Sequence, residues 1–237
     1  MIGYFGVRGL TDSSQARALH NAAWVEAAER GLHLGWESRL QSLVVDDHAI
    51  TRILNWIYIF GHWPVIALTL IWLLSRHPEL YARAAGAMLL SGAAGLVIFA
   101  AFPVAPPRLA GLGMSDTVTE QSHAYRVLQP PAFTNQYAAM PSLHVGWNLI
   151  MTMAILAATR KVWLRVLAVA LTVSMDATVV LTANHYVIDA LAGAALAHLG
   201  WHLTGRLQAR ARRQQQTTLE GFARPSPLVV ARPGRTG

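Results

Sequence analysis

The stretch that decides the fold of this chain covers residues 162–203 and reads VWLRVLAVALTVSMDATVVLTANHYVIDALAGAALAHLGWHL. It contains two apolar runs, residues 162–182 and residues 186–203. Each run is close to the roughly 20 residues that an α-helix needs to cross a bilayer. Because a short polar turn at residues 182–185 separates them, the stretch predicts two adjacent membrane-crossing helices.

Three further apolar stretches of similar length occupy residues 50–74, 82–102 and 142–158. These continuous runs are too long for the alternating pattern of a membrane β-barrel. We therefore expect an all-α integral membrane protein with a bundle of about five transmembrane helices. Small residues within the runs, among them Gly92 and Gly193, predict places where neighbouring helices approach closely.

The composition of the whole chain agrees with a membrane protein. Of 237 residues, 54% are hydrophobic and only 13% are charged, about half of the roughly 25% that soluble domains carry. The absence of cysteine argues against a disulfide scaffold and a cysteine-ligated metal protein. The net charge of +7 comes largely from seven arginines at or after Arg206, so we expect no nucleic-acid partner, whose binding site would need basic residues across a folded face.

The segments outside the apolar runs differ in character. Residues 14–45 have apolar residues at helical spacing, and Trp24 and Trp36 suit a membrane interface, so we expect an amphipathic interfacial helix. The loop of residues 103–140 is longer than a simple connection requires. We therefore divide the chain into an N-terminal segment, a transmembrane catalytic domain and a basic tail expected to be disordered: residues 1–49, 50–205 and 206–237.

The orientation of the bundle follows from arginine and lysine residues in the short loops. The loops at residues 75–83 and 159–165 and the start of the tail at Arg206 are basic. With five spans, these three segments lie on one side, which we assign to the cytoplasm. The long loop at 103–140 and the turn at 182–185 then face the extracytoplasmic side, which we take to be that of the plasma membrane.

Two polar clusters stand at the extracytoplasmic ends of the predicted spans: MPSLHVG at residues 140–146 and NHYVIDA at residues 184–190. His185 and Asp189 are four residues apart and so share one face of a helix. A carboxylate in that position can accept a hydrogen bond from the protonated nitrogen of the imidazole. The other ring nitrogen is then available as a nucleophile or base.

Other interpretations of these clusters remain open. Pro141 and Ser142 are common residues at helix starts, which would explain them without any chemistry. A single histidine at a membrane edge is more often structural, but His144, His185 and Asp189 on one side together favour a functional site. A zinc site is the less favoured alternative, since a fourth ligand is missing.

The motifs resemble those of the type 2 phosphatidic acid phosphatase superfamily. Residues 141–144 (PSLH) are similar to its second motif, P-S-x-H, and residues 185–189 to the end of its third motif, H-x-x-x-D. Residues 102–108 (FPVAPPR) resemble the reduced first motif of its inositol phosphorylceramide synthase-like, or inositolphosphotransferase, branch. The resemblance covers about residues 50–205 and implies a six-span core, of which this chain lacks an obvious first span.

The resemblance also implies a role for each matching residue. His185 would attack phosphorus and become phosphohistidine, and Asp189 would orient His185. His144 would protonate the leaving oxygen and later deprotonate the acceptor. Arg108 would bind phosphate oxygens, with amides near Ser142 as further donors. The family mechanism implies no metal ion and no other cofactor.

Several positions depart from the family pattern. The first motif usually has a lysine where this chain has Ala101, and the third usually has an arginine where it has Val179. Arg126 in the long loop is our candidate for a substitute cation. Asp176, within a predicted span, is a candidate partner of the histidines. These departures favour the transferase-like branch.

The sequence therefore predicts a membrane lipid phosphotransferase that takes a lipid phosphate as substrate and an alcohol such as inositol as acceptor. The alternative within the same superfamily is a lipid phosphate or polyprenyl diphosphate phosphatase. The alternative of another class is a non-enzymatic transporter or channel that uses the histidines as a proton relay.

Overall fold

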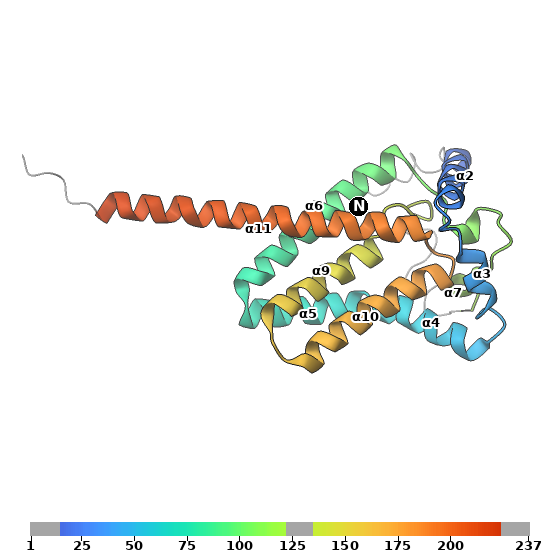
Figure 1. Ribbon diagram of the computed structural model, residues 1–237, viewed down its shortest axis with the longest axis horizontal. Coiled ribbons are helices and arrows are strands. Elements are labelled where there is room, and N and C mark those ends of the chain that lie inside the picture. Colours follow the sequence, from blue (N-terminus) through green and yellow to red (C-terminus); the bar gives the residue numbers. More distant parts are fainter. Residues whose placement is uncertain (1–14, 122–134, 224–237) are drawn as a thin grey trace, which may run out of the picture.

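The computed structural model describes residues 15–121 and 135–223, and Figure 1 shows their arrangement. Within these residues the structure is helical, with a single isolated β-bridge between Val104 and Ala138. The predicted all-α class is confirmed. The helices are α2 (Gln15–Gly31), α3 (Glu37–Ser42), α4 (His48–Phe60), α5 (Trp63–Arg76), α6 (Pro78–Ala101), the 3-10 helix η1 (Pro107–Leu109), α7 (Thr117–Gln121), α9 (Leu143–Ala158), α10 (Val162–Leu181) and α11 (Val187–Ala223).

Helix α9 lies in the middle of the bundle and packs against α5, α6, α10 and α11. The closest approach is between α9 and α11, where a methyl group added to Gly193 would lie 2.0 Å from the carbonyl oxygen of Ser142. Gly146 is also close to Gly193: a methyl group added to Gly146 would lie 2.8 Å from the Gly193 carbonyl oxygen. The predicted close packing at Gly193 is therefore confirmed, and it holds the starts of α9 and α11 together.

Two of the described helices, α6 and α10, are long and apolar enough to cross a membrane. The pair α4 and α5 makes a third span if its two halves, bent by 40°, are counted together. Helix α9 is shorter, at 16 residues. Helix α11 is long enough, but Asp189, His198 and His202 dilute its apolar stretch. The expected five-span bundle therefore stays a prediction for α9 and α11.

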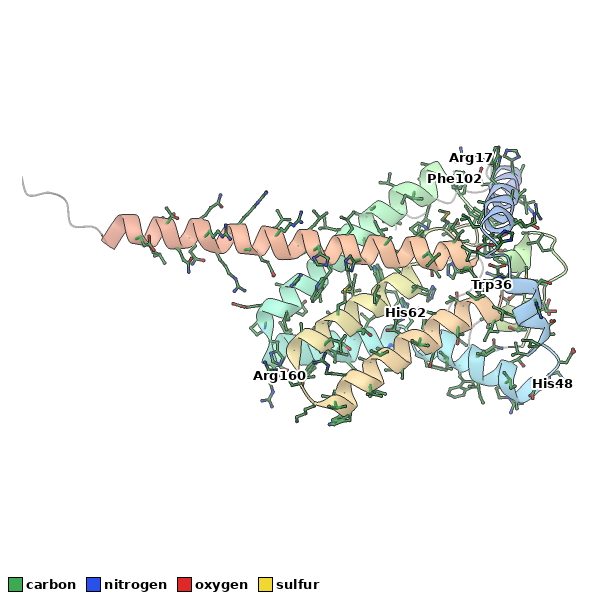
Figure 2. The ribbon with its side chains drawn as sticks, in the orientation of Figure 1. Arg17, Trp36, His48, His62, Phe102 and Arg160 are labelled. Carbon is green, nitrogen blue, oxygen red and sulfur yellow. The ribbon has the colours of Figure 1, made fainter. Side chains whose placement is uncertain are left out.

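The first predicted span, residues 50–74, is not continuous. Helix α4 ends at Phe60, and α5 starts at Trp63 after a turn at Gly61 and His62. Pro64 explains the break, because proline has no backbone N–H and its ring collides with the preceding helical turn. The turn places His62 in the interior of the bundle, with only 3% of its surface exposed (Figure 2).

The prediction of one amphipathic helix over residues 14–45 is wrong. The segment forms α2 and α3, separated by a turn in which His33 has a positive φ of 58°. The buried face of α2 consists of small and polar residues, whereas the apolar residues of the expected stripe are exposed: Leu19, Leu32 and Trp36. Asn21 Nδ2 donates to the Pro103 carbonyl at 2.8 Å, so α2 packs on the loop that follows α6.

The expected disorder from residue 206 onward is also wrong as far as Ala223. Helix α11 runs straight on beyond the bundle (Figure 1). Arg212 forms an ion pair with Glu79 of α6, and Gln208 donates to the Glu79 carbonyl. The polarity of this segment favours disorder, but Arg, Gln, Leu and Ala are all good helix formers. Residues 224–237 lie outside the described residues.

Candidate active site

The three motifs meet at one end of the bundle, where α10 ends, α11 begins and α2, α3 and α7 gather (Figure 1). Two backbone hydrogen bonds connect them. The Ser142 amide donates to the Asp189 carbonyl at 2.9 Å, and the Arg108 amide donates to the Ala183 carbonyl at 3.0 Å. Segments far apart in the sequence are therefore fixed to each other by main-chain contacts, which hold the motif side chains in a defined arrangement.

The ring of His185 is buried and has one fixed nitrogen. Its Nδ1 lies 2.8 Å from the carbonyl oxygen of Ala139. Because a carbonyl only accepts, Nδ1 carries the proton and Nε2 of the neutral ring has the free lone pair. This is the tautomer that a nucleophilic Nε2 requires.

Asp189 also lies near this ring, but the hydrogen bond from Nδ1 goes to the Ala139 carbonyl. Its Oδ2 is 3.6 Å from His185 Nδ1 and accepts a hydrogen bond from the Tyr186 amide at 2.9 Å. The sequence predicts that the carboxylate itself accepts the hydrogen bond from Nδ1, whereas in the structure the Ala139 carbonyl oxygen accepts it. Asp189 is completely buried, so its carboxyl group acts on the imidazole at short range in surroundings of low dielectric constant.

His144, in the first turn of α9, is held between two aromatic rings. Its ring centroid is 4.8 Å from that of Tyr58 and 4.4 Å from that of His62. Asn148 Nδ2 lies 3.1 Å from His62 Nδ1 and holds the His62 ring in place. The rings of His144 and His185 are 5.9 Å apart between centroids, a separation on the scale of a phosphoryl group placed between them.

The guanidinium of Arg108 is oriented by two side chains that the sequence analysis did not select. Arg108 Nη1 is 2.7 Å from Asp116 Oδ2, and Arg108 Nε donates to Asn184 Oδ1 at 2.9 Å. Asn184 directly precedes His185, and this position beside the third motif could have identified it as a site residue from the sequence. Asp116 lies in the long loop, where nothing in the sequence marks it. These bonds fix the plane of the guanidinium before any ligand binds.

A cavity of about 220 Å³ joins these groups. His144, His185 and Arg108, three residues predicted separately from three motifs, all line it. The rest of its wall comes from α4, α6, the long loop, the start of α9 and the turn between α10 and α11: Tyr58, Phe99, Pro106, Asn135, Gln136, Ala138, Ala139, Leu143 and Asn184. The cavity combines a free imidazole nitrogen, a second imidazole and a fixed cation.

The other predicted site residues that the structure describes do not line this cavity. Ser142 is completely buried and is the N-cap of α9, where its Oγ accepts from the Val145 amide at 3.5 Å. Asp176 lies on α10, and its Oδ1 has no hydrogen-bond partner among the described residues. Arg126 lies outside the described residues. Val179, the position where the family usually has an arginine, is buried in an apolar cluster. Across residues 15–121 and 135–223, no group of three or more His, Asp or Glu side chains is arranged to hold a metal ion.

Comparison with known proteins gives one match. The family model described as the PAP2 superfamily matches residues 23–203, a range that includes α3, the cavity and all three motifs. Neither the curated proteins nor the solved structures include a significant match to the chain.

Proposed function

The chain belongs to the PAP2 superfamily, and from this membership we propose that it is a membrane phosphotransferase of the inositol phosphorylceramide synthase type. PAP2 enzymes are phosphatases or phosphotransferases that act on phosphate esters. The proposed substrate is a lipid phosphate and the proposed acceptor is an alcohol such as inositol. The observation that carries the proposal is the shared cavity of His185, His144 and Arg108.

In the proposed first step, the Nε2 lone pair of His185 forms a bond to phosphorus while the bond from phosphorus to the leaving oxygen breaks. His144, protonated at that point, gives its proton to the leaving oxygen. In the second step, the acceptor oxygen attacks the phosphohistidine, His144 takes the acceptor proton, and the bond between nitrogen and phosphorus breaks. Both histidines thereby return to their starting protonation states.

Arg108 supplies the positive charge for the phosphate oxygens in this mechanism. Asp116 and Asn184 hold its guanidinium in place, so little reorganisation is needed when charge develops on the transferring group. Positions 101 and 179, where family motifs carry further cations, are Ala101 and Val179. This reduced set of cations supports the transferase-like branch over the plain phosphatases.

The proposed function differs from its alternatives in requiring an alcohol acceptor for the phosphate. We expect the purified protein, given a ³²P-labelled lipid phosphate in mixed micelles, to form a labelled inositol product only when inositol is present. His202→Ala serves as the matched control, because this exposed histidine of α11 is outside the cavity. Release of inorganic phosphate at the same rate with and without inositol would identify a phosphatase. Ion or solute flux in liposomes without any phosphate release would indicate a transporter.

We also propose that the cavity faces the extracytoplasmic side of the plasma membrane. Arg160 lies at the end of the bundle away from Trp36 and His48 (Figure 2), in the basic loop assigned to the cytoplasm. Ser115 lies in the long loop near the cavity and is exposed. Because the chain has no cysteine, single cysteines are specific probes. We expect Ser115→Cys to react with a membrane-impermeant maleimide in intact cells and Arg160→Cys to react only after lysis; the reverse pattern would contradict this orientation.

A further inference from the structure

The first amides of α11 are held by carboxylates from a distant part of the chain. The Ile188 amide donates to Glu29 Oε1 at 2.8 Å, and the Val187 amide donates to Glu37 Oε1 at 2.9 Å. Glu29 is in α2 and Glu37 is the first residue of α3, so the N-terminal segment caps the helix that follows His185. The first N–H groups of a helix have no partner within the helix, and caps of this kind satisfy them.

Both glutamates are buried, with 1% of Glu29 and 5% of Glu37 exposed. Burial raises the pKa of Glu29 to about 8, and the neighbouring Glu37 and Asp189 add to the rise. Glu29 therefore holds its proton at neutral pH. Serine or asparagine could cap the helix without burying a carboxyl group, so the choice of two glutamates calls for a reason beyond capping.

The reason lies in the place of His185. This residue lies two positions before the first of the capped amides, that of Val187, and its own amide donates to the Val179 carbonyl at the end of α10. The backbone of His185 is thus fixed on one side by α10 and on the other by the two glutamates. Asp189, in the first turn of the helix that the glutamates cap, has its carboxyl group beside the imidazole that becomes cationic when it is phosphorylated.

Resting on the proposed function, we propose that Glu29 and Glu37 are positioning residues for His185. They hold the start of α11 through the Val187 and Ile188 amides and so keep the His185 Nε2 lone pair directed into the cavity. The segment of residues 15–42 is then part of the catalytic machinery and not a membrane anchor alone.

Substitution of either glutamate should lower kcat with little change in KM, because the cavity wall that contacts the substrate stays intact. We expect Glu29→Ala and Glu37→Ala to lose up to about 10²-fold in kcat, the scale of a misplaced catalytic group. Glu26→Gln is the matched control: Glu26 is on α2 as well, but its carboxylate pairs with Arg30, whereas Glu29 and Glu37 accept from the α11 amides. Retention of normal kcat by both alanine variants would overturn the proposal.

The pH profile separates positioning from a general loss of stability. Glu29 is faced by Glu37 from α3, by Asp189 from the first turn of α11 and by Tyr186, which directly precedes α11. Above pH 8, ionised Glu29 would repel the other carboxyl groups, so wild-type kcat should fall. Glu29→Gln mimics the protonated acid and keeps an oxygen for the Ile188 amide, so its kcat should match wild type at pH 7 and stay high at pH 9. An alkaline fall of the same size in Glu29→Gln and wild type would contradict the assignment.

A readout that needs no turnover keeps this inference distinct from the proposed function. The ¹H–¹⁵N resonance of His185 Nδ1, donated to the Ala139 carbonyl, reports the position of the ring in the full-length protein in micelles. We expect Glu37→Ala to shift or broaden it and Glu26→Gln to leave it unchanged. If the wild type transfers no phosphate but the shift occurs, the proposed function fails and the positioning role stands. An active wild type with an unshifted Glu37→Ala resonance would refute the positioning role.

Discussion

Replacement of His185 by alanine should abolish both phosphate transfer and phosphate release, with a fall in turnover of at least about 10³-fold. The reason is that Nε2 of His185 forms the only covalent bond between protein and phosphorus in the proposed mechanism. Its Nδ1 donates to the Ala139 carbonyl, so Nε2 is the ring nitrogen whose lone pair is available for attack. The measurement is transfer of ³²P from the lipid substrate, together with the amount of acid-labile phosphoprotein after rapid quenching.

The controls for this experiment separate loss of chemistry from loss of fold. His185→Gln keeps an amide that can donate to Ala139 and should be equally inactive. Asp189→Asn should lose less, because the Ala139 carbonyl still holds the imidazole and only the charge beside it changes. Thermal unfolding of each variant shows whether the protein is folded. Near-normal turnover by folded His185→Ala would mean that another residue is the nucleophile.

Replacement of His144 by alanine should lower turnover of a lipid substrate by about 10²- to 10⁴-fold, the usual contribution of general acid–base catalysis. A lipid alkoxide is a poor leaving group and needs the proton that His144 supplies. An aryl phosphate has a good leaving group and needs no such proton. His144→Ala should therefore still undergo the first step with an aryl phosphate, although the second step lacks its base.

The expected result is a burst of phenolate equal to the amount of enzyme, followed by accumulation of phosphohistidine in His144→Ala. Wild type should show steady turnover with little phosphoprotein. His198→Ala is a suitable control, because the ring of this histidine contacts that of His202 and does not line the cavity. Equal loss of activity of His144→Ala toward lipid and aryl substrates, without a burst, would assign His144 a structural role between Tyr58 and His62.

Two local features of the backbone determine where the site residues lie. Proline-induced unwinding at residues 61–62 brings His62 against His144, and the close contact at Gly193 brings the start of α9 against α11. Irregular backbone at membrane depth persists where protein surrounds it. Both features help to position His144 relative to His185.

The sequence by itself determined the features that depend on local spacing. Long apolar runs located α6 and α10, because a membrane-crossing helix needs a continuous apolar stretch whatever its neighbours are. The order and spacing of the motifs selected Arg108, His144 and His185, and the structure brings these three to one cavity. In each case, the information lies within a few consecutive residues.

Only the tertiary structure decided which distant groups serve these residues. Asp116 pairs with Arg108, and the Ala139 carbonyl accepts a hydrogen bond from His185. Glu29 and Glu37 accept from α11 amides that lie 159 and 150 residues later in the sequence. In the sequence, Glu29 and Glu37 look like the solvent-facing charges of an amphipathic helix. Periodicity reports which residues share a face of a helix, but it carries no information on which surface that face meets, and this contact alone turns two ordinary glutamates into buried caps.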